Sequence, residues 1–316
     1  MSENRIPRLP ATGGAAAGAG DDAVPPSLFS RCNVPPWRLA SVEFQNDPQP
    51  LEIEGVRTAD ARLFALLDAA GDAAERGRIF HDYVSVKFRL HEWADYDGSA
   101  RAALRHSYVQ LLHAWSADSN SRAGAVLKGW VENRFGLRAT FHNGRLTGGA
   151  PADTAAARER YWLDRMRGAE RMLGVSMQLD LLFTFCQDEL RRHFGDSERW
   201  VTLYRGTHDA DEYELRGGGG GGTGGTGGGE GREGGNGAGG GGDGTGGGAP
   251  TVFFNNLSSF SSDSEVAWEF GSRVWEVRVP LAKVVFFSGL LPAHLLGGEA
   301  EWLVLGGEYH VKTLTF

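Results

Sequence analysis

The spacing of the apolar residues changes near Trp200, and this change limits the folds that the chain can adopt. Before Trp200, apolar side chains recur three and four residues apart, which is the spacing of one face of a helix. Helices are therefore expected after caps at Thr58 and Ser99, through residues 79–88, and over residues 123–135, 154–173 and 175–194. The first 200 residues thus form a mainly helical region.

After Trp200, short runs rich in β-branched and aromatic residues replace the helical spacing. Such runs predict strands, which are expected over residues 200–204, 251–254, 275–279, 284–287, 302–305 and 309–316. One short helix is expected between them, over residues 263–270. Helices followed by strands indicate an α+β fold.

The four prolines of residues 34–50 predict an irregular or extended segment that packs Trp37 and Phe44 onto the body.

Glycine is concentrated in one tract. Of the 47 glycines, 23 lie in residues 217–248, and the rest of the chain has an ordinary globular composition. A stretch this poor in apolar residues predicts a disordered insertion over residues 217–249, and residues 1–24 predict a disordered leader. The expected division is then a helical region at 25–200 and a β-rich region at 201–316 that carries the insertion.

Charge and motif content exclude several classes of function. The net charge is −8, and the 32 basic residues are scattered among 40 acidic ones, so we expect no nucleic-acid partner. The two cysteines form no C-x-x-C pair, no H-E-x-x-H motif occurs, and Cys186 reads as a buried apolar residue, so no metal is expected. The sequence has neither a secretory signal nor an apolar run of roughly 20 residues. We therefore expect a cytoplasmic protein with no transmembrane segment.

Three short polar islands beside the predicted strands are candidates for chemistry. The first is Tyr-Arg-Gly at residues 204–206, where Arg205 can bind a diphosphate through two parallel hydrogen bonds. The second places Ser258 and Ser259 after an aromatic strand. The third is Glu-Ala-Glu, and residues two apart on an extended chain point to the same side, so Glu299 and Glu301 would face one site.

Each island by itself also has an ordinary structural explanation. Arg205 suits a strand edge before a turn, the serines suit a polar turn, and the two glutamates suit a solvated strand face. The three islands in this order are much more specific than any one of them. Together they offer a cation for a diphosphate, a bracing hydroxyl and an acidic pair for a cationic reaction centre.

The ordered islands resemble the arginine-specific mono-ADP-ribosyltransferases, whose signature is Arg, then a strand with Ser, then Glu-x-Glu. More narrowly, the chain resembles the NAD-dependent dinitrogenase reductase ADP-ribosyltransferases of nitrogen-fixing bacteria. The resemblance covers most of the chain after about Asn33 and is carried by residues 203–207, 254–260, 270–271, 279–284 and 298–307. It implies a β-rich ADP-ribosyltransferase core, a split β-sandwich, with the helical half packed on it.

The resemblance also implies roles for the islands. Arg205 would hold the NAD phosphates and the Gly206 backbone would receive the nicotinamide amide. Glu301 would stabilise the oxocarbenium-like transition state, braced by Ser258. Ser259 is the alternative brace, because the island reads Leu-Ser-Ser-Phe rather than Ser-Thr-Ser. Phe260 or Phe270 is a candidate to pack on nicotinamide.

Glu299 would orient the acceptor, an arginine of dinitrogenase reductase, which is the nitrogenase iron protein. The resemblance implies that this modification reversibly inactivates nitrogenase, and that a PII-type nitrogen-signalling protein is a further partner. NAD would be a substrate, with no metal needed. Two alternatives stay open from the residues alone: an NAD glycohydrolase, which uses water as the acceptor, and a non-catalytic module that binds NAD or a partner.

Overall fold

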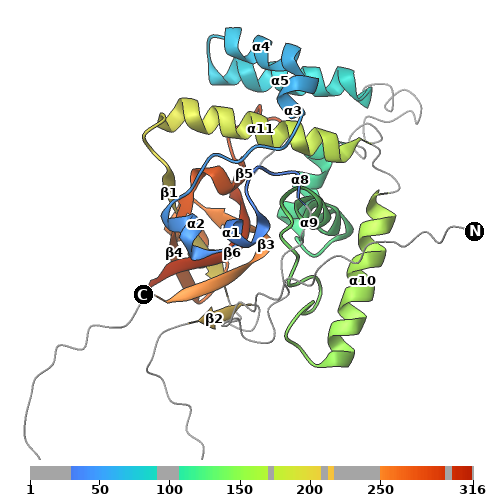
Figure 1. Ribbon diagram of the computed structural model, residues 1–316, viewed down its shortest axis with the longest axis vertical. Helices are drawn as coiled ribbons and strands as arrows, with labels where there is room; N and C mark the ends of the chain where they lie inside the picture. The colour runs from blue at the N-terminus through green and yellow to red at the C-terminus, as the bar shows by residue number, and fades with distance from the viewer. Residues whose placement is uncertain are drawn as a thin grey trace, which may run out of the picture.

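The computed structural model describes residues 30–90, 107–169, 174–207, 213–216, 250–295 and 301–314. Figure 1 shows a curved sheet with helices over one end and one side. The helices are α1 (Pro36–Leu39), α2 (Val42–Asn46), α3 (Val56–Ala59), α4 (Ala61–Ala69), α5 (Ala73–Lys87), α8 (Tyr108–Ala117), α9 (Arg122–Phe135), α10 (Pro151–Ala169), α11 (Val175–Phe194), α12 (Ser264–Glu269) and the 3-10 helix η2 (Leu281–Lys283). The strands are β1 (Trp200–Thr207), β2 (Glu214–Arg216), β3 (Thr251–Ser261), β4 (Arg273–Pro280), β5 (Val284–Phe287) and β6 (Glu301–Leu314). This arrangement confirms the α+β class.

The six strands form one antiparallel sheet in the order β2-β3-β1-β4-β6-β5, and β3 also pairs with β6. Because β3 pairs with both β1 and β6, the strands β1, β4, β6 and β3 close into a ring. Along β3 and β6 the register places Ser259 opposite Leu303 and Ser261 opposite Glu301. The serine island and the second glutamate are thus fixed in adjacent strands.

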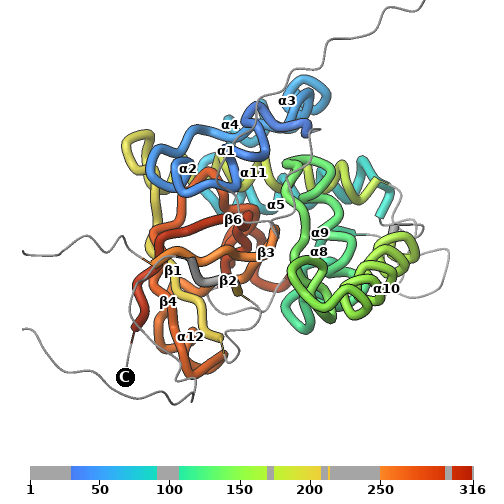
Figure 2. Tube along the Cα trace, turned by 60° about the horizontal axis from the view of Figure 1, so that its bottom comes forward, coloured from blue at the N-terminus to red at the C-terminus, as the bar shows by residue number. Residues whose placement is uncertain are grey.

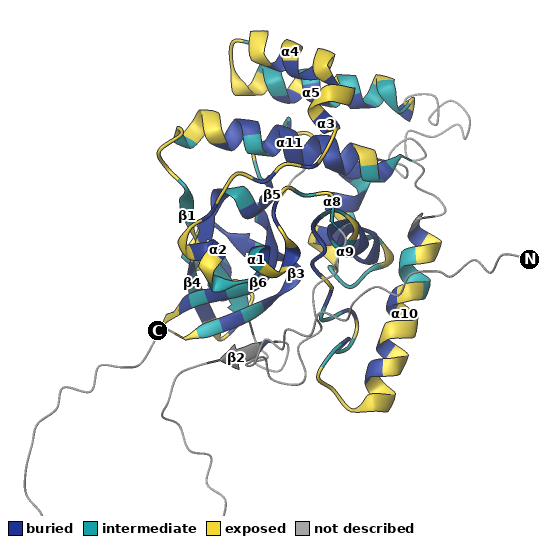
Figure 3. Ribbon diagram, in the orientation of Figure 1, coloured by how far each residue is buried: buried dark blue, intermediate teal, exposed yellow. Residues whose placement is uncertain are grey.

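Helix α11 covers the end of the sheet formed by β5, and its buried face is continuous with the main core. Figure 3 shows this face as buried, while the outer faces of α4 and α5 are exposed. Leu182, Phe183 and Phe185 of α11 are almost fully buried. Cys186 is also buried, as its sequence context predicts, and burial raises the pKa of its thiol.

The proline-rich segment is partly helical: it contains α1 and α2, whereas residues 47–50 are irregular as expected. Pro36 occupies the first turn of α1. An N–H at this position would have no partner within the helix, so its absence from proline costs nothing, and the fixed φ of proline suits a helix. Phe44 of α2 is fully buried as expected, but Trp37 is 67% exposed, so its predicted packing is wrong. Figure 2 shows α1 and α2 beside the sheet. There the Gln45 side chain bonds the backbone of Arg278 and His310.

Several predicted boundaries change in the structure. Strand β3 continues through the serine island to Ser261, so the serines lie in a strand and not in a turn. Strand β6 joins the two strands expected at 302–305 and 309–316. The short strand β2 was not predicted. The leader 1–24, the insertion 217–249 and the cap at Ser99 lie outside the described residues.

Two asparagines in a bulge of β3 fasten the helical half to the sheet. The register of β3 against β6 shifts between Phe254 and Leu257, and Asn255 and Asn256 lie in this bulge. The Asn256 amide is buried and donates to the carbonyls of Lys128, in α9, and Leu137 at 2.9 and 3.0 Å.

None of the helices among the described residues combines the length and the apolar character that a membrane span requires.

Asn256→Ala should destabilise the protein, because two carbonyls near α9 would lose a buried donor. We expect the free energy of unfolding to fall by about 2–4 kcal/mol, measured by urea denaturation. The matched control is Asn33→Ala, which removes three hydrogen bonds at an exposed residue. An equal loss of unfolding free energy in the two variants would contradict the role of Asn256 in fastening the helical half to the sheet.

A buried lysine predicts how stability changes with pH. Lys283 is fully buried and its Nζ donates to the Gly306 carbonyl at 2.9 Å. Burial lowers the pKa of Lys283 from 10.5 to about 7. Between these two values the unfolded chain holds a proton that the folded chain has lost. The free energy of unfolding should therefore rise with pH over this window and lose this contribution as the pH falls towards 7.

Lys283→Met should abolish this dependence. The difference in the free energy of unfolding, wild type minus variant, should increase by up to about 1.4 kcal/mol per pH unit above pH 7. Urea unfolding of both proteins at pH 7, 8 and 9 measures this. Parallel curves would show that Lys283 keeps an ordinary pKa.

Candidate active site

A pocket of about 710 Å³ opens where β1 and β3 separate. These two strands pair where Tyr204 of β1 lies opposite Ser261 of β3. Residues 205–207 of β1 and 259–260 of β3 would continue that ladder, but they line the pocket instead, together with Glu301 of β6. A volume of roughly 300–1,000 Å³ is typical of small-molecule sites. The three islands, far apart in the sequence, thus meet in one cavity.

Glu301 is held by a serine of the neighbouring strand. Side chains two apart on a strand share a face, so Ser259 and Ser261 point the same way, and so do Glu301 and Leu303. The register then makes Ser259 and Glu301 diagonal neighbours on one face. The Ser259 hydroxyl donates to Glu301 Oε1 at 2.9 Å.

The hydroxyl that braces Glu301 belongs to Ser259, and not to Ser258 as expected. Ser258 pairs with Val304, on the opposite face of the strand. Its side chain is buried and its hydroxyl donates to the Asn255 carbonyl at 3.3 Å. The alternation of side chains along β3 therefore separates the roles of two adjacent serines.

Arg205 connects the first island to the second. Its guanidinium donates to the backbone carbonyl of Ser259 and, from Nε and NH2, to the Tyr213 hydroxyl at 2.8 and 2.5 Å. It also lies over the rings of Tyr213 and Phe260, 5.5 and 5.9 Å from their centroids. A guanidinium so held has a fixed plane and places positive charge in the pocket. Tyr213 has no sequence signal beyond its aromatic character.

Gly206 is required for packing as well as for the pocket. A Cβ at Gly206 would lie 1.9 Å from the Ala267 carbonyl oxygen of α12, so a side chain there would displace that helix.

The two aromatic residues that are candidates to pack on nicotinamide differ in exposure. Phe260 is 4% exposed, whereas Phe270 is 65% exposed at the rim of the pocket.

Helix α8 contributes two further residues to the site, and no local sequence pattern marks either of them. The indole Nε1 of Trp115 donates to Ser259 Oγ at 2.8 Å. The Ser116 hydroxyl donates to Glu301 Oε2 at 2.5 Å. The Trp115 side chain is buried. Trp115 and its partner Ser259 in β3 are 144 residues apart in the sequence, so no local sequence pattern could predict this contact.

The acidic side chains of the pocket outnumber its basic ones among the described residues. Asp118, Glu269 and Glu301 line it with the single cation Arg205. Such a cavity places negative charge beside one fixed positive group, which suits a ligand that combines phosphates with a developing cation. Glu299, the other member of the acidic pair, lies outside the described residues.

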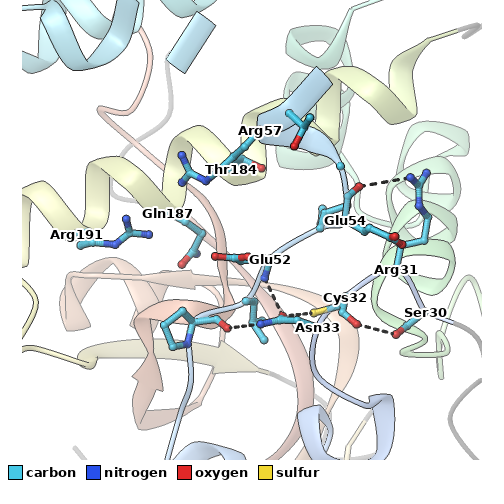
Figure 4. Close-up of a pocket in the computed structure, with 15 residues that line it drawn as sticks. Ser30, Arg31, Cys32, Asn33, Glu52, Glu54, Arg57, Thr184, Gln187 and Arg191 are labelled. Atoms are coloured by element: carbon cyan, nitrogen blue, oxygen red, sulfur yellow. Dashed lines mark hydrogen bonds between the residues drawn. The ribbon is translucent and has the colours of Figure 1, made fainter. Parts of the chain in front are cut away.

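A second pocket, of about 580 Å³, lies between residues 30–58 and α11 (Figure 4). Its polar groups bond to the protein itself. Arg57 and Arg191 both pair with Asp188, and the Gln187 amide donates to two backbone carbonyls. None of the predicted site residues in the described part of the chain lines this pocket.

Comparison with known proteins identifies a family. The sequence model of the dinitrogenase reductase ADP-ribosyltransferases (DRAT) matches residues 29–220 and 245–313. The chain is 36% identical over 278 residues to the NAD(+)--dinitrogen-reductase ADP-D-ribosyltransferase of Rhodospirillum rubrum, a match that covers 87% of this chain and 90% of that protein. No solved structure matches the chain. Since both matches span most of its length, the chain belongs to the dinitrogenase reductase ADP-ribosyltransferase family.

Proposed function

We propose that the protein transfers ADP-ribose from NAD to an arginine of dinitrogenase reductase and releases nicotinamide. The family description and the name of the R. rubrum relative support both substrates. The observation that carries the proposal is the contact of Ser259 with Glu301 in the pocket that Arg205 lines. NAD is consumed as a substrate in this reaction.

Cleavage of the bond between nicotinamide and ribose leaves positive charge on the ribose. Nicotinamide departs as a neutral molecule, so the ribose approaches an oxocarbenium ion. The Glu301 carboxylate, fixed by a hydrogen bond to Ser259, stabilises that charge and accepts a hydrogen bond from a ribose hydroxyl. A fixed anion in a partly closed site needs little reorganisation as the charge develops.

The remaining pocket residues bind the rest of NAD. The Arg205 guanidinium holds the phosphates, and the Gly206 backbone receives the nicotinamide amide. Phe260, which is buried in the wall, supports Arg205 through its ring, and Phe270 at the rim is the more accessible aromatic surface for nicotinamide.

The acceptor guanidinium needs its own acid. The acceptor guanidinium stays protonated at neutral pH, and a protonated guanidinium is a poor nucleophile. Glu299 orients it and helps to take its proton as the nitrogen attacks the ribose carbon. The products are ADP-ribosyl-arginine, nicotinamide and one proton.

The modification adds bulk and phosphate charge to dinitrogenase reductase and so blocks its docking within nitrogenase. Removal of the group would restore docking, which makes the inactivation reversible. Cytoplasmic location and control by a PII-type nitrogen-signalling protein complete the proposal. The family resemblance supports the second of these parts.

Glu301→Gln should abolish transfer while the protein stays folded. Loss of a charge that stabilises the transition state costs about 3–4 kcal/mol, or a few hundredfold in rate. The assay incubates labelled NAD, dinitrogenase reductase and the enzyme, and mass spectrometry locates ADP-ribose on the acceptor arginine.

Glu276→Gln is the matched control, because Glu276 is an acid on β4 that pairs with Lys312 away from the pocket. Its transfer rate should equal that of the wild type. Retained transfer by Glu301→Gln, or label that appears solely as free ADP-ribose with the wild type, would exclude the proposed function.

Glu299→Gln should separate transfer from hydrolysis. Water needs no acid to orient a guanidinium, so the variant should lose transfer to the acceptor and keep release of nicotinamide from NAD. Both products are measured in one reaction. If nicotinamide release and transfer fall together, Glu299 acts on NAD and not on the acceptor.

A further inference from the structure

Helix α8, which belongs to the helical half, reaches the carboxylate of Glu301 by two routes. One runs through Trp115 and Ser259, and the other runs directly from Ser116. Ser259 and Glu301 belong to strands of the sheet. The two oxygens of the Glu301 carboxylate are thus contacted from both halves of the molecule.

The route through Trp115 has a fixed direction. An indole N–H can donate a hydrogen bond but cannot accept one. Ser259 Oγ must therefore accept from Trp115 Nε1 at 2.8 Å. The hydroxyl has a single proton, which it then directs to Glu301 Oε1 at 2.9 Å. Trp115 thus sets the orientation in which Ser259 acts as a donor to Glu301.

The second route fixes the other carboxylate oxygen. The Ser116 hydroxyl donates to Glu301 Oε2 at 2.5 Å, a short distance that suits an O–H bond to an anion. With both oxygens held, the carboxylate plane is set before any substrate binds. Each carboxylate oxygen has two lone pairs, so these contacts leave acceptor capacity towards the pocket.

The end of α8 is itself anchored. Lys128 of α9 is buried, and its Nζ lies 5.8 Å from the centroid of the Trp115 ring. The same Nζ donates to Asn120 Oδ1 and to the Phe141 carbonyl, both at 3.0 Å. Asn120 lies three residues after the end of α8, so these contacts tie the segment that follows the helix to α9.

We propose that Trp115 and Ser116 are positioning residues that hold the Glu301 carboxylate in its reactive orientation. This inference rests on the proposed function, because it takes Glu301 as the group that stabilises the transition state. It assigns the helical half a part in catalysis that acts through Glu301. The sheet alone would supply Glu301 and Ser259 but would leave Oε2 and the Ser259 hydroxyl without these contacts.

The test compares steady-state transfer by the full-length wild type with that of Trp115→Phe and Ser116→Ala, using NAD and dinitrogenase reductase. Each variant should lower kcat by about tenfold and leave KM for NAD within about twofold, since one oriented hydrogen bond is lost and no binding group is removed. Ser116→Thr keeps a hydroxyl and should restore most of kcat.

Trp130→Phe is the matched control for Trp115. Trp130 is also buried and donates its indole N–H to a partner, Asp180 at 2.8 Å, away from the pocket. Thermal unfolding should show a comparable loss of stability in both tryptophan variants. A drop in kcat confined to Trp115→Phe then separates positioning from general destabilisation.

Three outcomes overturn the inference. In the first, both variants keep the full kcat. In the second, Ser116→Ala lowers KM for NAD and raises the rate at low NAD, which would mean that Ser116 competes with the substrate for Oε2. In the third, Trp130→Phe lowers kcat as much as Trp115→Phe. These results differ from failure of the proposed function, in which the wild type itself transfers no ADP-ribose.

Discussion

The double pairing of β3 is the constraint on which the site depends. This strand pairs with β6 along most of its length but with β1 at a single recorded position. The first pairing sets Ser259 diagonally across from Glu301, and the early end of the second opens the space that the pocket occupies. Arg205 then donates to the Ser259 carbonyl at the place where a strand partner would otherwise lie. One strand thus positions the cation, the hydroxyl and the carboxylate.

The helical half is joined to the sheet at the same strand. The bulge at Asn255 and Asn256 bonds the backbone of α9 and of the segment that follows it. Ser259, a few residues further along, accepts from Trp115 of α8. Burial of apolar surface between the halves is non-directional and does not fix an orientation to a fraction of an ångström. Buried hydrogen bonds to named backbone and side-chain atoms supply that precision.

The sequence allowed the fold class to be predicted, and it pointed to residues that the structure brings together in one pocket, because both rest on local patterns. Helical and alternating spacings are visible in short windows, and Arg205 and Glu301 flank apolar runs. The choice between Ser258 and Ser259 could not be made, since a shift of one residue in register turns a side chain to the other face. Trp115 and Ser116 read as part of an ordinary helix, and their roles depend on a tertiary contact. The short helices α1 and α2 were missed because prolines suggested extended backbone.

The closed ring of strands also affects how the protein behaves at high concentration. A sheet with free edges offers unpaired N–H and C=O groups to strands of neighbouring molecules, which promotes aggregation. Among the described residues, the two ends of the strand order are β2, with three residues, and β5, with four, and β5 lies under α11. The long strands β3, β4 and β6 each have partners on both sides. The exception is the stretch where β1 and β3 separate, so the strand edges that stay unpaired among these residues are the ones that line the pocket.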